Sequence, residues 1–258
     1  MKIFTFWEPK DKLPGYLELC LESWKKYIKD CEIVMLDYSN LDNYLNLKEF
    51  DKAFSGTFSL TQQSDAIRCA ILNKHGGLWL DCDTIITSDK INDFLNTEKP
   101  FTLIGNHICF IKAEKDCSIL NEWEKEVQNR ITESKKVNLF TKIFHNREYK
   151  KIKSWDYFGN SILSSILNGN EEFYSIDKYQ NKIFPEQNYQ TENNIKLKAT
   201  KNYRHFYFYN DFSEYALQDN CGIICLHNSW TPEIFREMTK SEFLEQKNTL
   251  SGIFKTIL

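Results

Sequence analysis

One segment, from Ser64 to Ile86, limits the possible folds of this chain more than any other. Three apolar residues in its first part recur at helical spacing: Ile67, Ala70 and Ile71. Gly76 and Gly77 then supply positions with positive φ, which end a helix. The apolar run from 78 to 80 follows at once and predicts a short buried strand. A helix, a two-glycine stop and a buried strand in this order predict an α/β protein.

Two aspartates come directly after the predicted strand. Asp81 and Asp83 are two residues apart, so alternation along an extended chain places both side chains on one side, with Cys82 turned away. Two carboxylates just outside the carboxyl end of a strand suit a hard divalent cation that carries a substrate's phosphates. A solvated acidic turn is the alternative, and it is the usual explanation of a pattern this short. The surrounding sequence has to decide between the two.

Asp65 and Arg68 stand three residues apart in the predicted helix, so they share one face beside the apolar stripe. A polar face next to a packed face can present both an acidic and a basic side chain to a ligand. The alternative is a surface ion pair, which contributes roughly a few tenths of a kcal/mol.

The elements expected elsewhere extend the α/β pattern. Residues 2–7 alternate as a strand, a helix follows to about residue 28, and 32–37 predicts a second strand. This order predicts a parallel βαβ unit, the usual frame of a nucleotide-binding half-domain. Further along, we expect helices at 41–54, 88–96, 117–131 and 161–167, strands at 101–105, 108–112 and 222–226, an exposed loop at 180–203, and helices after Pro232.

The length and charge of the chain narrow the functional classes. A chain of 258 residues can bury the core of one α/β domain. We expect a single domain over 1–258, with a helical insertion at about 115–180 and C-terminal helices at about 231–258. A net charge of −3 gives no case for a basic surface stripe, so we expect no nucleic acid as partner. The aromatic content of 15% suits a protein that stacks on rings.

Cysteine spacing and hydropathy predict the cellular compartment of the protein. The eight cysteines show no CxxC pair and no zinc spacing with the five histidines, and Lys2 leads directly into a strand rather than a signal peptide. No apolar run approaches the ~18 residues of a membrane span. We therefore expect a cytoplasmic protein with reduced thiols.

The stretch from Lys135 to Lys153 is the one strongly basic part of the sequence, with seven Lys or Arg residues and one acid, Glu148. A solvated helix face is the commoner explanation of such a stretch. The alternative is a contact with anionic lipid heads, peripheral at the inner face of the membrane, or with a phosphate-bearing acceptor.

The central segment resembles the signature of glycosyltransferase family 32, the DXD sugar-binding-region glycosyltransferases. This family includes bacterial capsule and surface-polysaccharide enzymes and is related to the glucosylating domains of large clostridial toxins. The resemblance rests on Ser64-Asp65-Ala66-Ile67-Arg68 and on the run from Gly76 to Thr84. Two flanking pieces are similar to the same family: the first strand with Trp7, and His227-Asn228-Ser229-Trp230 near the end.

The resemblance implies a GT-A type fold, a nucleotide-sugar donor, and Mn²⁺ or Mg²⁺ as cofactor. It implies that Asp83 and His227 are metal ligands and that Asp81 bridges the ribose and metal-bound water. Trp7 would stack on the donor's uracil, although a core tryptophan is the explanation that the sequence alone favours. The further donor contacts that the resemblance implies are Ser64, Asp65, Arg68, Ser229 and Trp230. Asn160, or Asp156, could lie beneath the reacting sugar, because the family has a glycine at a point comparable to Gly159.

Together these features predict a metal-dependent retaining glycosyltransferase. It would move a hexose or N-acetylhexosamine from a nucleotide sugar, here taken as a UDP-sugar, to an oligosaccharide or lipid-linked glycan acceptor in surface polysaccharide synthesis. Asp81, Asp83 and Asn160 are the catalytic residues of this interpretation. Two alternatives stay open: a non-catalytic nucleotide- or carbohydrate-binding module of the same fold, and a sugar-phosphate transferase or nucleotidyltransferase.

Overall fold

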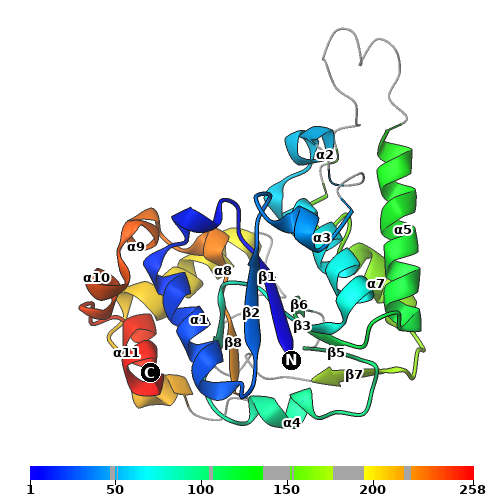
Figure 1. Cartoon of the computed structure of the whole chain (residues 1–258). Helices are drawn as coiled ribbons and strands as arrows, with labels where there is room; N and C mark the ends of the chain where they lie inside the picture. Colours follow the sequence, from blue (N-terminus) through cyan, green and yellow to red (C-terminus); the bar gives the residue numbers. More distant parts are fainter. Residues whose placement is uncertain are drawn as a thin grey trace, which may run out of the picture. The chain divides into compact units, whose positions relative to one another are not determined.

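A computed structural model of the chain describes residues 1–46, 50, 52–104, 107–135, 152, 154–176, 195–217 and 222–258 (Figure 1). The described residues form two compact units. The first comprises Met1–Lys10, Glu32–Leu80 and Glu98–Ser175, and the second comprises Asp11–Cys31, Asp81–Thr97 and Ile176–Leu258. Most of the basic stretch from Lys135 to Lys153, and the part of the expected loop up to residue 194, lie outside the described residues.

The first unit is built on a six-stranded sheet with the order β2-β1-β3-β6-β5-β7. Its strands are β1 (Lys2–Phe6), β2 (Glu32–Leu36), β3 (Gly77–Leu80), β5 (Phe101–Ile104), β6 (His107–Ala113) and β7 (Phe173–Ile176). β1 pairs in parallel with β2 and β3, whereas β6 pairs antiparallel with β3 and β5. β5 therefore runs in the same direction as β1, β2 and β3, and β6 runs the opposite way. The predicted α/β class with a mixed, mostly parallel sheet is confirmed.

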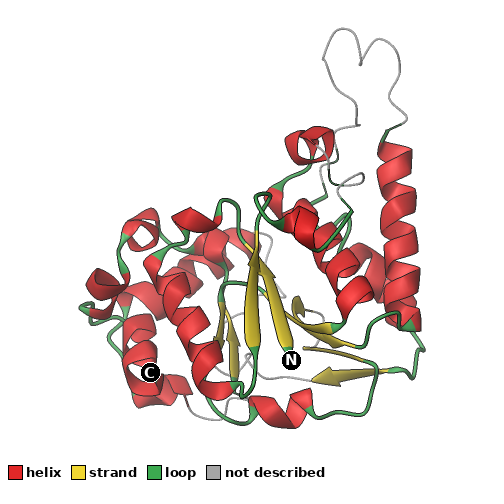
Figure 2. Cartoon of the chain, viewed as in Figure 1, coloured by secondary structure: helices red, strands yellow, loops and turns green. Residues whose placement is uncertain are grey.

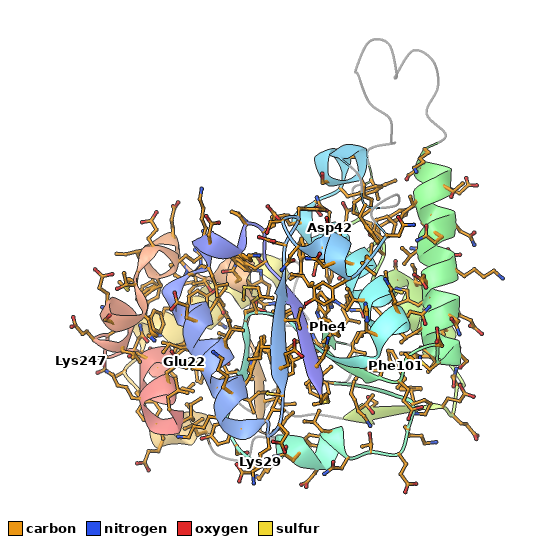
Figure 3. The ribbon with its side chains drawn as sticks, viewed as in Figure 1. Phe4, Glu22, Lys29, Asp42, Phe101 and Lys247 are labelled. Carbon is orange, nitrogen blue, oxygen red and sulfur yellow. The ribbon has the colours of Figure 1, made fainter. Side chains whose placement is uncertain are left out.

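Helices of the first unit pack against this sheet and against one another (Figure 2). They are α2 (Lys52–Thr57), α3 (Leu60–His75), α5 (Ser118–Ser134) and α7 (Asn160–Leu167), with a short 3₁₀ turn, η2 (Leu41–Asn43). α3 packs against β1, β3 and α5, and α5 packs against α7. Large aromatic side chains fill the interior, among them Phe4 from β1 and Phe101 from β5 (Figure 3).

The ends of α3 are set by the signals that the sequence carries. Ser59 caps the start, because its hydroxyl accepts the Gln62 N–H while the Gln62 side chain accepts the Ser59 N–H at 2.9 Å. Gly76 and Gly77 end the helix with φ values of 63° and 101°. A Cβ atom at Gly77 would lie 2.7 Å from the carbonyl oxygen of Lys2 in β1, so a side chain there would push β3 away from its neighbour.

The second unit consists mostly of helices, with a two-stranded antiparallel sheet of β4 (Thr84–Ile86) and β8 (Ile223–Cys225). Its helices are α1 (Gly15–Tyr27), α4 (Ile91–Leu95), α8 (Ile195–Arg204), α9 (Glu233–Glu237), α10 (Lys240–Leu244) and α11 (Thr249–Ile257). Its shorter turns are η5 (His205–Tyr209), η6 (Glu214–Leu217) and η7 (Asn228–Trp230), and η1 (Lys10–Lys12) crosses the boundary from the first unit.

Helix α1 is fixed on β4 by two hydrogen bonds. Trp24 donates its indole N–H to the Thr84 carbonyl at 2.7 Å, and Ser23 accepts the Ile86 N–H at 3.0 Å. Both side chains are buried, so these bonds replace the water that the edge of a short strand would otherwise need. The position of β4, and of the residues just before it, therefore depends on α1.

Three expectations about the elements are wrong. The helix expected at 41–54 is not continuous, because η2 is a short 3₁₀ turn and residues 44–46 are not helical before α2 begins at Lys52. Residues 195–204 form α8 rather than part of an exposed loop, because the stretch has no Gly or Pro to break a helix and its Tyr203 is fully buried. The expected helical insertion also contains β7, which joins the six-stranded sheet. The expected helices after Pro232 are confirmed. Within the described part of the chain, no helix has the length and apolar character to cross a membrane.

Candidate functional site

Asp81, Cys82 and Asp83 lie in a tight turn between β3 and β4 and not in an extended strand. The Thr84 N–H donates to the Asp81 carbonyl at 2.9 Å, which closes the turn. Cys82 is buried, with 4% of its surface exposed. The expectation that strand alternation aligns the two aspartates is wrong, and the turn is what brings their carboxyl groups near one another.

The pairing of β4 with β8 brings the C-terminal motif to Asp83. Thr84 is opposite Cys225 in the register, and the Leu226 N–H donates to the Asp83 carbonyl at 2.9 Å. The chain then turns, so that the Asn228 N–H donates to Oδ2 of Asp83 at 2.8 Å. Two segments 145 residues apart in sequence therefore meet at this carboxylate.

The surroundings of Asp83 disfavour its ionised form. Burial and the neighbouring charge of Asp81 raise the pKa of Asp83 to about 6, while the Asn228 N–H and the charge of His227 act in the opposite direction. A bound cation would favour the ionised carboxylate.

His227, Ser229 and Trp230 share one turn at the end of β8. The Trp230 N–H donates to the His227 carbonyl at 2.9 Å, and the His227 and Trp230 rings lie 4.3 Å apart between centroids. Ser229 is exposed, whereas the other two are half-buried. Arg204 of α8 donates to the Trp230 carbonyl at 2.7 Å and so holds the end of the turn.

The structure thus brings Asp81, Asp83, His227, Ser229 and Trp230 together in the second unit. Carboxylates and an imidazole are donors that Mn²⁺ or Mg²⁺ accepts, so the donor set fits such an ion. No three His, Cys, Asp or Glu side chains among the described residues are grouped closely enough to hold a metal ion by themselves. Oxygens of a bound diphosphate or water would be needed as additional ligands.

Asp65 and Arg68 form a buried ion pair in the first unit. Nη2 of Arg68 lies 3.5 Å from Oδ1 of Asp65, and their side chains are 4% and 3% exposed. The surface ion pair that the sequence left open is therefore wrong, because α3 turns this face into the unit. Arg68 also donates to the Ile108 carbonyl of β6 and to the Ser64 hydroxyl, and its guanidinium lies 5.1 Å from the Trp79 ring centre.

The segment before α7 lies directly against Asp65. A Cβ atom at Gly159 would be 2.5 Å from Oδ2 of Asp65, so the lack of a side chain allows this approach. Asn160, the first residue of α7, follows at once and is half-buried. The predicted site residue Asn160 therefore directly follows a glycine that packs against Asp65.

Trp7 is half-buried just after β1, where its N–H donates to the Leu36 carbonyl at 3.0 Å. Asp37, which the sequence analysis missed, follows β2 at the same edge of the sheet. It is 5% exposed, and Nζ of Lys10 lies 3.3 Å from Oδ1 of Asp37. Burial opposes ionisation, but hydrogen bonds from Ser39 and Lys10 lower the pKa of Asp37. The signal that could have found it is an acid directly after a strand.

The sequence analysis also missed two residues that hold the His227 turn by hydrogen bonds. The Tyr16 hydroxyl donates to Oδ1 of Asn228 at 2.5 Å, and the Tyr203 hydroxyl accepts the His227 N–H at 3.1 Å. Both tyrosines are fully buried. No local pattern marks them, because an aromatic residue on the packed face of a helix is usually part of the core.

Comparison of the sequence with curated proteins gives no significant match. Among solved structures, the apo form of the glycosyltransferase GlyE from Streptococcus pneumoniae TIGR4 is similar, with 12% identity and a TM-score of 0.43 over 99% of this chain and 62% of that one. The PaToxG glycosyltransferase is similar with 12% identity and a TM-score of 0.36, over 99% of this chain and 84% of that one. This chain thus spans less than two thirds of the GlyE chain.

A family model described as capsular polysaccharide synthesis protein matches residues 1–221, which include Trp7, the buried Asp65 and Arg68 pair and the turn with Asp81 and Asp83. The expected resemblance to capsule enzymes is confirmed at this level. The chain belongs to the capsular polysaccharide synthesis protein family.

Proposed function

We propose that this chain is a metal-dependent glycosyltransferase that moves a hexose or N-acetylhexosamine from a UDP-sugar to a glycan or lipid-linked acceptor in capsule synthesis. Membership of the capsular polysaccharide synthesis protein family supports the part of the proposal that concerns capsule synthesis. The observation that carries the proposal is the meeting of Asp83 with Asn228: a strand pair holds a half-buried carboxylate next to a second acid and an imidazole. Such a set suits a cation that accompanies a diphosphate.

The residues of the second unit have the following proposed roles. Asp83 and His227 would hold Mn²⁺ or Mg²⁺, and Asp81 would bind the ribose and ion-bound water. The chemistry that such an ion supplies when bound is neutralisation of the charge on the leaving diphosphate. The Asn228 N–H keeps the Asp83 carboxylate in place, and Ser229 and Trp230 would contact the diphosphate.

The residues of the first unit would act on the nucleoside and the sugar. Trp7 would stack on the uracil, and Asp65, Arg68 and Asn160 would orient the sugar, with retention of its anomeric configuration. Because Asp65 and Arg68 are almost fully buried, a sugar could reach them only after the residues around Gly159 or Ser64 shift. Substrate-induced shifts of this kind are common in transferases.

Hydrolysis of a UDP-sugar in the absence of acceptor tests the proposal. We expect release of UDP with Mn²⁺ and its loss with EDTA. Release of UMP or pyrophosphate instead would favour a sugar-phosphate transferase or nucleotidyltransferase. Binding of the donor without turnover, for a full panel of UDP- and GDP-sugars and acceptors, would favour a non-catalytic binding module.

Contact of the chain with a membrane surface is a separate proposal. The basic stretch from Lys135 to Lys153 would contact anionic lipid heads and so bring the enzyme to a lipid-linked acceptor. Co-sedimentation with vesicles that contain anionic lipid, compared with neutral vesicles, measures this contact. Equal sedimentation with the two kinds of vesicle would contradict it.

A further inference from the structure

Two buried phenols lie beneath the turn that carries His227, all within the second unit. Tyr16 is in the first turn of α1 and Tyr203 is near the end of α8, and each has 0% of its surface exposed. The hydroxyl of Thr231, which is 1% exposed, lies 3.5 Å from both phenolic oxygens. Three hydroxyl groups are therefore gathered in a place that water does not reach.

These hydroxyls contact the turn at successive backbone and side-chain groups. The Tyr16 hydroxyl donates to Oδ1 of Asn228 at 2.5 Å, while the N–H of the same asparagine donates to Asp83 at 2.8 Å. The Tyr203 hydroxyl accepts the N–H of His227 at 3.1 Å. His227, a proposed metal ligand, is thus held by Tyr203. Asn228, which orients the proposed ligand Asp83, is held by Tyr16.

Packing alone does not explain why both residues carry a hydroxyl. The Tyr16 ring lies 5.7 Å from the Phe243 ring, and the Tyr203 ring lies 5.9 Å and 5.7 Å from the His227 and Trp230 rings. Phenylalanine would keep all of these ring contacts. A buried hydroxyl without a partner is destabilising, so its presence is accounted for by the bonds that it makes.

We propose that Tyr16 and Tyr203 are positioning residues for the metal and diphosphate site. Their hydroxyls fix the backbone of residues 227–231, so that the Asn228 N–H stays directed at Asp83 and the His227 ring stays beside it. The inference rests on the proposed function and adds to it residues of α1 and α8 that contact no substrate.

Removal of single hydroxyl groups, with the rest of each side chain nearly unchanged in shape, tests this inference. The variants are Tyr16→Phe, Tyr203→Phe and Thr231→Val, and the matched control is Tyr27→Phe. Tyr27 lies at the other end of α1, where its hydroxyl donates to the Ile257 carbonyl at 2.9 Å. A general loss of stability from a missing phenolic hydrogen bond would affect the control as well.

Two measurements are needed. Hydrogen exchange of the protein without ligand reports the order of the turn, and calorimetric titration with UDP and Mn²⁺ reports affinity. For Tyr16→Phe and Tyr203→Phe we expect faster exchange in peptides that cover 227–231 and affinity that is about 3- to 10-fold weaker, the effect of one lost hydrogen bond. The KM for the donor should rise in proportion. Tyr27→Phe should leave the exchange of 227–231 and the affinity unchanged.

The possible failures are distinct. If the wild-type protein binds UDP with Mn²⁺ and both phenylalanine variants bind as tightly, the inference is wrong and the proposed function stands. The inference is also wrong if Tyr16→Phe, Tyr203→Phe and Thr231→Val all fold and none of them changes the hydrogen exchange of residues 227–231. If the wild-type protein binds no UDP with Mn²⁺, the proposed function is refuted and the inference falls with it.

Discussion

Replacement of Asp83 by asparagine should abolish donor turnover and yet stabilise the protein without metal at neutral pH. The pKa of Asp83 is raised to about 6 in the folded protein, chiefly by burial and by Asp81, from an ordinary value of 3.8. The folded state therefore binds this proton more tightly than the unfolded state does. Stability falls as the pH rises from about 4 to about 6 and stays low above that range.

The size of the effect follows from the two pKa values. One pKa unit corresponds to about 1.4 kcal/mol, so the ionised Asp83 lowers the free energy of unfolding by up to about 3 kcal/mol at pH 7.5. Asparagine keeps an acceptor for the Asn228 N–H and removes the charge. For a chain of this size such a gain corresponds to roughly 6–12 °C in melting temperature.

Urea unfolding in EDTA, at intervals from pH 4 to pH 8, measures this prediction. The difference between Asp83→Asn and the wild type should be near zero at pH 4 and should grow to its plateau above pH 6. Asp89→Asn, which changes an exposed aspartate of the same unit, is the control measured alongside it. A gain that is the same at every pH, or no gain at pH 7.5, would refute the reasoning. Addition of UDP and Mn²⁺ should then stabilise the wild type more than Asp83→Asn.

Three further predictions concern the first unit. Gly159→Ala should lower kcat/KM and cost about 1–3 kcal/mol, because its Cβ would collide with Asp65, whereas Gly56→Ala, which meets nothing within 4 Å, should be neutral or stabilising in urea titrations. Arg68→Lys should cost about 3 kcal/mol or more of unfolding free energy, since one ammonium group cannot replace the donors to Ile108, Ser64 and Asp65; a cost below that of a surface substitution would contradict the burial argument. Trp7→Ala should raise the KM for a UDP-sugar about 3- to 10-fold with kcat little changed, and an unchanged KM would contradict stacking of Trp7 on the uracil.

The elements that the sequence predicted correctly depend on local signals. The alternation of β1 and the two glycines after α3 each act over a few residues, so they can be recognised without the fold. The polar composition of 195–204 misled the prediction, because α8 needs just one narrow buried face around Tyr203.

The geometry of the acidic turn was less predictable for a different reason. Strand alternation predicted where the two aspartates point, but the chain has to bend between β3 and β4, and the bond from Thr84 to Asp81 forms that bend. Whether a short apolar run continues as a strand or turns depends on the partner strand. Here that partner is β8, more than 130 residues later in the chain.

The supports of Asp83 follow from long-range contacts alone, and this determines which changes should damage the site. Asn228 is 145 residues from Asp83, and Tyr16 is 212 residues from Asn228. A substitution in α1 can therefore disturb the acidic turn while every residue of the recognisable motif is intact. By the same argument, a fragment that holds residues 64–86 alone would lack the N–H that orders Asp83. Such a fragment should bind UDP with Mn²⁺ no better than an unstructured peptide with two aspartates, and binding at the affinity of the whole chain would show that the turn needs neither β8 nor α1.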